Sequence, residues 1–285
     1  MSATPQPHAT LDSLRFRGLP IVTVNGIAFD QEERSLFVAV WQPDRTPEGR
    51  RRLRIVEWRN ENGNWTGPLA APFSRTPYTD YQPVYSHDRQ RLYFQSTRPL
   101  PGDSVEVRQN LWYVDRTATG WSEPRYIDAL NTPYIEGYAA PTANGVLYFN
   151  SNRPGGLGSQ DVYRSRVSGD RYSAPEPVME LNSADGENDL VVDPRERFVI
   201  FNRFRNADRS IDLFIAFRSG NGWGPARKLN NVNDTMPTAW ELTPSISPDG
   251  RRFYYTMRDT IRQVPLASLI YEDEMPGFGV RRRER

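Results

Sequence analysis

The chain has 285 residues, with 36 Lys plus Arg against 35 Asp plus Glu, no cysteine and two histidines. This composition excludes a disulfide framework, a thiol nucleophile and a cysteine-ligated metal, and a net charge of +1 gives no general attraction to nucleic acid. Lys228 is the only lysine, so the other cations are arginines, which hold planar anions and do not form Schiff bases.

The first twenty residues, MSATPQPHATLDSLRFRGLP, lack the apolar stretch of a secretory signal, and no 18-residue apolar run predicts a membrane span. We therefore expect a cytoplasmic protein as encoded, or a periplasmic one if the sequence is a trimmed mature form. The predicted organisation is a tail over residues 1–19, one folded domain over 20–272 and a basic tail over 273–285, in a monomer.

An internal repeat dominates the chain. Four strand-like runs each end at an arginine: LYFQSTR (92–98), LYFNSNR (147–153), VIFNRFR (199–205) and FYYTMR (253–258). The closing arginines are spaced 55, 52 and 53 residues apart. A second marker, an aromatic residue shortly before a proline, keeps a similar period at Trp65, Trp121, Tyr172 and Trp223. Self-similarity at a fixed period of this size predicts stacked copies of one structural unit.

Each unit is predicted to contain four short strands. In the third unit EGYAAPTA ends at Asn144-Gly145, a strong hairpin signal, and is followed by LYFNSN, by DVYRSRV and by a last strand toward Leu181-Asn182. No segment has helical periodicity over the ten or more residues that a helix needs. Four strands in a period of about 50 predict an all-β fold, the β-propeller.

The repeat predicts five blades of four antiparallel strands. Their approximate ranges are 24–76, 77–132, 133–183, 184–235 and 236–272. The last unit lacks an outer strand, while PIVTVN (20–25) resembles the outer-strand segment PRYIDALN (124–131). We therefore expect the N-terminal strand to close the last blade, which protects both edges of the ring.

Two strings carry a family resemblance: NSNRPGGLGSQDVY (150–163) and SPDGRRFYYTMR (247–258) resemble the TolB-like, WD-like propeller repeat. The resemblance extends from about Ile21 to Ile270 and implies a propeller of the kind common in bacterial periplasmic and cell-envelope proteins. The chain departs from the family pattern in its lack of an export signal and in Gln42, where the other units have arginine. Such propellers host both binding and catalysis, so the resemblance implies a fold more than an activity.

A repeated pair of charged residues is the main candidate site. Four acids begin the first strands of their units, and four arginines end the second strands: Asp80, Glu136, Glu187 and Glu241, with Arg98, Arg153, Arg205 and Arg258. Because the start of a first strand lies beside the end of the second, we expect the pairs to gather at one end of the central channel. Blade one has Val24 and Gln42 instead, which leaves a gap in the ring.

Two interpretations of this ring remain open. Each pair could be a salt bridge within its blade, or the charges could surround a channel mouth that binds a polar ligand. Asp189, two residues after Glu187, adds a carboxylate without an arginine. The nearby aromatics Tyr81, Tyr138 and Trp240 would either pack between blades or form a platform for a ligand.

The favoured functional hypothesis is a rigid propeller that binds a polar small molecule, a glycan or a partner protein at the channel mouth. The alternative is an enzyme that uses carboxylates, tyrosines and arginines, either a glycoside hydrolase or a lyase, isomerase or cyclase, with Glu136, Asp189 and Glu241 as its catalytic candidates. His87 lies in a turn on the opposite face, so no Ser-His-Asp triad is expected. We expect no cofactor and no tight metal, because arginines compensate the acids. A purely structural interaction protein is the third possibility.

Overall fold

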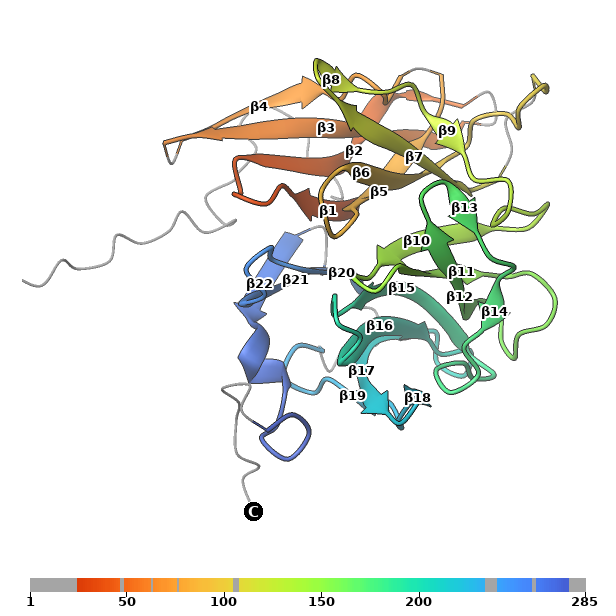
Figure 1. Ribbon diagram of the computed structural model, residues 1–285, viewed down its shortest axis with the longest axis vertical. Coiled ribbons are helices and arrows are strands. Elements are labelled where there is room, and N and C mark those ends of the chain that lie inside the picture. Colours follow the sequence, from red (N-terminus) through yellow and green to blue (C-terminus); the bar gives the residue numbers. More distant parts are fainter. Residues whose placement is uncertain are drawn as a thin grey trace, which may run out of the picture.

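The computed structural model describes residues 25–46, 49–62, 64–75, 77–104, 108–233, 240–257 and 260–276. Within these ranges the chain forms five antiparallel sheets, which follow one another along the sequence. The sheets stand around a common centre, so the fold is a five-bladed β-propeller, and the prediction from the repeat is confirmed (Figure 1).

Each sheet is one blade, and its strands lie in sequence order from the inside outward. The first blade contains β1 (Asn25–Phe29), β2 (Ser35–Arg45), β3 (Arg51–Glu61) and β4 (Asn64–Ala70). The second contains β5 (Asp80–Tyr85), β6 (Arg91–Ser96), β7 (Asn110–Thr117), β8 (Gly120–Trp121) and β9 (Arg125–Tyr126). The third contains β10 (Glu136–Pro141), β11 (Val146–Ser151), β12 (Asp161–Ser168), β13 (Arg171–Tyr172) and β14 (Glu176–Pro177). The fourth contains β15 (Gly186–Val192), β16 (Phe198–Phe204), β17 (Ile211–Ser219), β18 (Gly222–Trp223) and β19 (Arg227–Lys228). The fifth contains β20 (Glu241–Ile246), β21 (Arg252–Met257) and β22 (Thr260–Pro265), followed by the 3-10 helix η2 (Leu266–Leu269).

The first strands of the five blades form a closed inner ring. Strand β1 contacts β5, β5 contacts β10, β10 contacts β15, β15 contacts β20, and β20 contacts β1. Figure 1 shows these strands gathered around the middle of the molecule, with the later strands of each blade farther out. Each inner strand also carries a β-bulge in its pairing with the second strand. The bulges bend the strands beside the channel and redirect side chains there.

The fourth strand of blades two, three and four is split into two short pieces. In blade two, β8 and β9 both pair with β7, and Pro124 lies between them. Proline has no backbone N–H to give to the ladder, which weakens pairing at this point, although β4 of blade one continues through Pro68.

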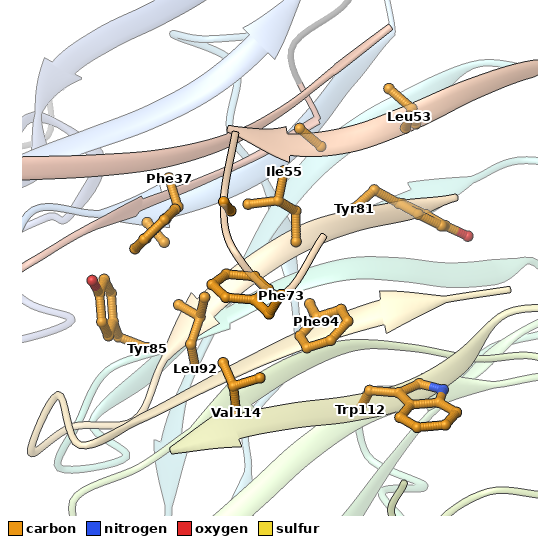
Figure 2. Packing of buried hydrophobic residues seen from close by; sticks show 13 residues of the cluster. Phe37, Leu53, Ile55, Phe73, Tyr81, Tyr85, Leu92, Phe94, Trp112 and Val114 are labelled. Carbon is orange, nitrogen blue, oxygen red and sulfur yellow. The ribbon is translucent and has the colours of Figure 1, made fainter. Parts of the chain in front are cut away.

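Five clusters of buried hydrophobic residues hold the ring together, one at each seam between neighbouring blades. Figure 2 shows the seam between blades one and two, where Phe37 and Ile55 face Leu92 and Phe94 across Phe73. The ring centroids of Phe73 and Phe94 are 5.5 Å apart. The hydrophobic stabilisation is therefore distributed over five seams rather than placed in one core.

The repeated aromatic of the fourth strand contacts the preceding blade at these seams. The ring centroid of Trp121 lies 5.9 Å from that of Phe37 in blade one, and the ring centroid of Trp223 lies 6.1 Å from that of Tyr148 in blade three. The Tyr172 hydroxyl donates to the Tyr93 hydroxyl of blade two at 3.3 Å. The marker found in the sequence is thus a seam residue.

Several predictions fall on residues outside the described ranges. Closure of the last blade depends on residues 20–24, and the two predicted tails lie almost wholly outside, so these stay predictions. No helix within the described ranges has the length and apolar character needed to cross a bilayer.

Candidate functional site

Asp80, the first residue of β5, is fully buried in a network that joins three segments of chain. Arg98 donates to its two carboxylate oxygens at 2.5 and 3.1 Å, and the hydroxyls of Ser96 and Ser74 donate at 2.7 and 2.9 Å. Arg98 also donates to the Phe73 carbonyl at 2.5 Å. Burial raises the pKa of the Asp80 carboxyl, whereas Arg98 and the two serines lower it. The carboxylate thereby connects the incoming loop, the inner strand and the end of the second strand.

Glu136 repeats this arrangement at the start of β10. The backbone N–H and hydroxyl of Thr132 donate to it at 2.9 and 2.5 Å, and Ser151 and Arg153 donate at 3.1 Å each. Arg153 also donates to the Leu130 carbonyl in the loop that enters the blade. The same kind of three-way connection is therefore made in two successive blades.

Glu187 of β15 keeps the network but uses a different arginine from the predicted one. Arg203 donates from Nε to Glu187 at 2.6 Å and from Nη2 to the Leu181 carbonyl at 3.2 Å. Ser183 adds its N–H at 3.0 Å and its hydroxyl at 2.6 Å. Burial raises the Glu187 pKa, opposed by Ser183 and Arg203.

The predicted pairing of Glu187 with Arg205 is wrong. Arg203 is directly opposite Glu187 in the β15–β16 register, at the position that Ser151 occupies opposite Glu136. Arg205 lies beyond the end of the strand and donates to Asp208 at 2.5 Å and to the Ser210 hydroxyl at 2.9 Å. The 52-residue spacing of the closing arginines identified the repeat but not the partner of this acid.

The fourth acid, Glu241, is also fully buried and lies opposite Met257 in the β20–β21 register. Its predicted partner Arg258 lies outside the described ranges. All four acids thus have no exposed surface, and the three described arginine pairs lie within single blades. This geometry favours the salt-bridge interpretation, and it disfavours a direct contact between these carboxylates and a ligand.

A cavity of about 480 Å³ occupies the channel, away from the four acids. It is lined by the middle and end of all five inner strands and by residues of the hairpin turns that follow four of them. The wall is largely apolar, with Ala28, Val84, Ala140, Val191 and Ile246 contributing from one blade each. The cavity reaches exposed turn residues such as His87 and Arg195, so it opens at the end opposite the acids. We call this the turn end.

The floor of the cavity is polar. Gln82, Tyr138 and Thr243 line it, and they occupy the same repeat position as Asp189, at the bulge of each inner strand. Asp189 is 5% exposed and accepts a hydrogen bond from the Thr243 N–H at 2.7 Å. The Tyr138 hydroxyl lies close enough to lower the Asp189 pKa, and the Gln82 side chain in turn lowers the pKa of Tyr138.

Burial dominates the ionisation of this group. It raises the Asp189 pKa to about 7 against the lowering effect of the Thr243 N–H and the Tyr138 hydroxyl. Burial also raises the Tyr138 pKa, and the Asp189 charge adds to that shift. Among the predicted acids in the described part of the chain, Asp189 alone lies directly behind the cavity floor, next to the lining residues Tyr138 and Thr243, and forms no ion pair with an arginine there.

The rim at the turn end carries charged side chains. Asp193 is held by Arg197, which donates to it at 2.9 and 2.6 Å. Arg89 lies 5.4 Å above the Tyr85 ring, and its Nε is buried with no hydrogen-bond partner among the described residues. Arg195 is exposed, and no carboxylate within the described ranges forms an ion pair with it. In those ranges no three His, Asp or Glu side chains come together as a metal site would require.

The remaining predicted residues fall at different places. Tyr81 is buried in the seam between blades one and two, whereas Trp240 is 44% exposed. Sequence reasoning missed Gln82, Thr243 and Arg89. The first two could have been found by aligning the units at the Tyr138 and Asp189 position, and Arg89 occupies the turn position of Gly145 and Gly250.

Comparisons with known proteins show the fold and no more. No family model and no curated protein matches the chain. A structure described as a TolB candidate from Agrobacterium tumefaciens matches with a TM-score of 0.52 and 12% identity, over 86% of this chain and 76% of the other. A glycosyl hydrolase from Bacteroides ovatus matches with a TM-score of 0.52 and 9% identity, over 85% of this chain and 83% of the other. The resemblance to the TolB-like propeller repeat is confirmed, at the level of the fold.

Proposed function

We propose that this propeller is a binding protein and that its ligand site is the central cavity at the turn end. The observation that carries the proposal is the cavity itself: about 480 Å³, formed jointly by all five inner strands, with apolar walls and a polar floor. Small-molecule sites have volumes of about 300–1,000 Å³ and combine apolar walls with a few polar groups. A small molecule therefore suits the cavity better than a glycan or protein surface would.

The site lies at the opposite end of the channel from the one expected from the sequence. The four repeated acids at that other end are buried, and Asp80, Glu136 and Glu187 are hydrogen-bonded within their blades, so they support the scaffold of the site. Tyr138 and Asp189, which the sequence also proposed, belong to the floor of the cavity or lie directly behind it.

A thermal-shift screen of organic acids, amines, sugars and short peptides, followed by calorimetry of each hit, tests the proposal. Val84 lines the cavity outside the seam clusters, so Val84→Trp should fill the space and weaken binding at least about tenfold while the circular dichroism spectrum is retained. Leu157→Trp, at a side chain that is 53% exposed and outside the cavity, is the matched control and should bind normally. A hit that binds Val84→Trp as tightly as the wild type would place the ligand elsewhere.

Catalysis is a second candidate function, supported by one observation. Asp189 has a pKa raised to about 7 and is influenced by the nearby Tyr138 hydroxyl, which lines the cavity, so the pair could pass a proton to a bound molecule. Glu136 and Glu241 do not line the cavity, and the carboxylates that do, Asp193 and Asp249, are bound by Arg197 and Ser247 at the rim, which disfavours the carboxylate pair of a glycoside hydrolase. If a ligand is converted, Asp189→Asn should abolish turnover and keep binding within about threefold; turnover by that variant would exclude Asp189 as the proton donor.

A further inference from the structure

The five hairpin turns between first and second strands provide a comparison that singles out Arg89. Their fourth position has a left-handed backbone, which Gly145 and Gly250 adopt at φ of 71° and 69°. Glu33, Arg89 and Glu196 adopt it at φ of 53°, 61° and 55°, although a side chain there costs about 1 kcal/mol. A side chain retained at such a position needs an explanation in its contacts.

The two glutamates each make a polar contact with the neighbouring blade across a seam. Glu33 of blade one forms an ion pair with Arg252 of blade five. Glu196 of blade four accepts from the Tyr148 hydroxyl of blade three at 2.6 Å and from Asn144 at 3.1 Å. Both residues therefore bind one blade to its neighbour.

Arg89 makes no such contact across a seam in the described ranges. Its guanidinium lies over Tyr85 of its own blade and lines the cavity, and its buried Nε has no hydrogen-bond partner there. Burial lowers the Arg89 pKa, and the carboxylate that influences it, Asp30, forms no ion pair with it and accepts a hydrogen bond from the Arg34 N–H at 2.7 Å. A half-buried arginine with an unused donor is suited to bind an anion.

The other charges at the rim leave this preference intact. Asp193 is engaged by Arg197, and Asp249 accepts from the Ser247 hydroxyl at 2.5 Å and from the Arg251 N–H at 3.0 Å. Arg195 adds a second guanidinium without an ion pair among the described residues. The rim therefore has cationic donors available and acidic groups already in use.

The floor of the cavity offers a hydrogen-bond acceptor, whereas the rim offers donors. Gln82 is 5% exposed and lines the cavity, and its Oε1 has no partner among the described residues. Gln82 and Asp189 both influence the pKa of Tyr138, so the three side chains lie close together at the floor. A buried carbonyl oxygen without a donor costs about 1–3 kcal/mol, which a ligand N–H or O–H would recover.

We propose that the cavity takes an amphipathic carboxylate, with its anionic group on Arg89 and Arg195 at the rim, its apolar body along the walls, and an amine or hydroxyl donor on Gln82 at the floor. This inference rests on the proposed function. The three residue steps from Gln82 to Tyr85 span about 10 Å of strand, so a chain of about eight carbons matches the depth.

The test uses three probes on the wild-type protein: 8-aminooctanoate, octanoate, which lacks the donor, and octylamine, which lacks the carboxylate. Calorimetry should show 8-aminooctanoate binding about tenfold or more tighter than either of the others, since each lost end removes one charge-assisted or buried hydrogen bond. Because this comparison needs no variant, it does not depend on whether a mutant folds.

Two substitutions then assign the ends. Arg89→Ala should weaken the binding of 8-aminooctanoate and octanoate about tenfold and leave the binding of octylamine unchanged. Gln82→Leu should make 8-aminooctanoate bind no more tightly than octanoate. Arg125→Ala, at an exposed arginine in the outer strand of the same blade, is the matched control and should change nothing. Equal binding of the three probes, or none at 10 mM, overturns the proposal. If Val84→Trp still abolishes binding of another hit, the proposed function survives that failure.

Discussion

The repeated acids at one end of the channel and the cavity groups at the other differ in their hydrogen bonding, although Gln95 Oε1 and Asn150 Oδ1, beside the acids, are also buried without partners in the described ranges. At the acid end, Asp80, Glu136 and Glu187 are fully buried, and each accepts hydrogen bonds from an arginine and from hydroxyl groups nearby. At the turn end, Gln82 Oε1 and Arg89 Nε are buried without partners in the described ranges. A saturated network stabilises one structure, while an unsaturated one can still gain energy from a ligand.

The comparison also separates repetition from function. The saturated pairs recur from blade to blade because every blade must fix its inner strand to the incoming loop. The cavity floor differs between blades, with Gln82, Tyr138, Asp189 and Thr243 at one repeat position, and of these only Gln82 has a buried atom without a partner in the described ranges. A ring whose units are unlike at one level can orient an asymmetric ligand, which four like pairs cannot do.

Removal of an acid-end arginine should have the largest effect on stability. Arg98→Ala leaves the buried Asp80 carboxylate without its cation, so the free energy of unfolding should fall by about 3–5 kcal/mol in urea titrations. Arg125→Ala, at an arginine that is 54% exposed, should change it by less than about 1 kcal/mol. Equal effects of the two substitutions would contradict the structural role of the Asp80 network.

The floor of the cavity predicts a pH dependence with a defined sign. The Asp189 pKa is raised from 3.8 to about 7, so the folded protein binds the proton more tightly than the unfolded chain does. Unfolding then releases a proton, and this contribution to stability is complete below about pH 4 and is lost as the pH rises to 7, by at most about 4 kcal/mol.

The measurement compares wild type with Asp189→Asn in urea titrations from pH 4 to 8. The difference between the two proteins isolates Asp189, because Asp80 and Glu187, whose pKa values burial also raises, are present in both. The variant should gain stability relative to wild type as the pH rises. A difference that is constant over this range would show that Asp189 ionises normally.

A pair of arginines two residues apart tests the corrected partner of Glu187. Arg203→Ala should lower the free energy of unfolding by about 2–3 kcal/mol, because it removes a charged hydrogen bond to a buried carboxylate. Arg205→Ala should cost less than about 1 kcal/mol, since Arg205 is 43% exposed and binds turn residues. The reverse order would restore the pairing expected from the sequence.

The smallest effect on stability is expected at the rim. Arg195 is exposed at the turn end, so Arg195→Ala should shift the free energy of unfolding by less than about 0.5 kcal/mol. The same variant should bind 8-aminooctanoate severalfold more weakly than the wild type does. A large loss of stability would mean that the rim is part of the scaffold, as the acid end is, and the contrast between the two ends would disappear.

Much of the scaffold could be predicted from the chain because its signals are local and repeated. The runs that end in arginine became second strands, the Asn144-Gly145 dipeptide became a hairpin turn, and the aromatic before proline became a seam residue. Spacing also placed Asp80 and Glu136 at the starts of inner strands. Spacing did not identify the partner of Glu187, because a partner on the next strand is set by the strand register. In that register Arg203 is opposite Glu187, and Arg205 is two residues farther along the chain.

The sequence by itself determined the number of blades, the order of strands in each and the recurring acids and arginines, because period and alternation are properties of neighbouring residues. Only the tertiary structure decided which end of the channel is closed over its charges and which is open. That outcome depends on which groups are buried and which hydrogen bonds are made when the five blades pack together. Asp80 is fully buried among its hydrogen-bond partners. Gln82, two residues farther along β5, lines the cavity, and its Oε1 has no partner in the described ranges. Which polar groups find hydrogen-bond partners is settled only when residues from all five blades surround the same space.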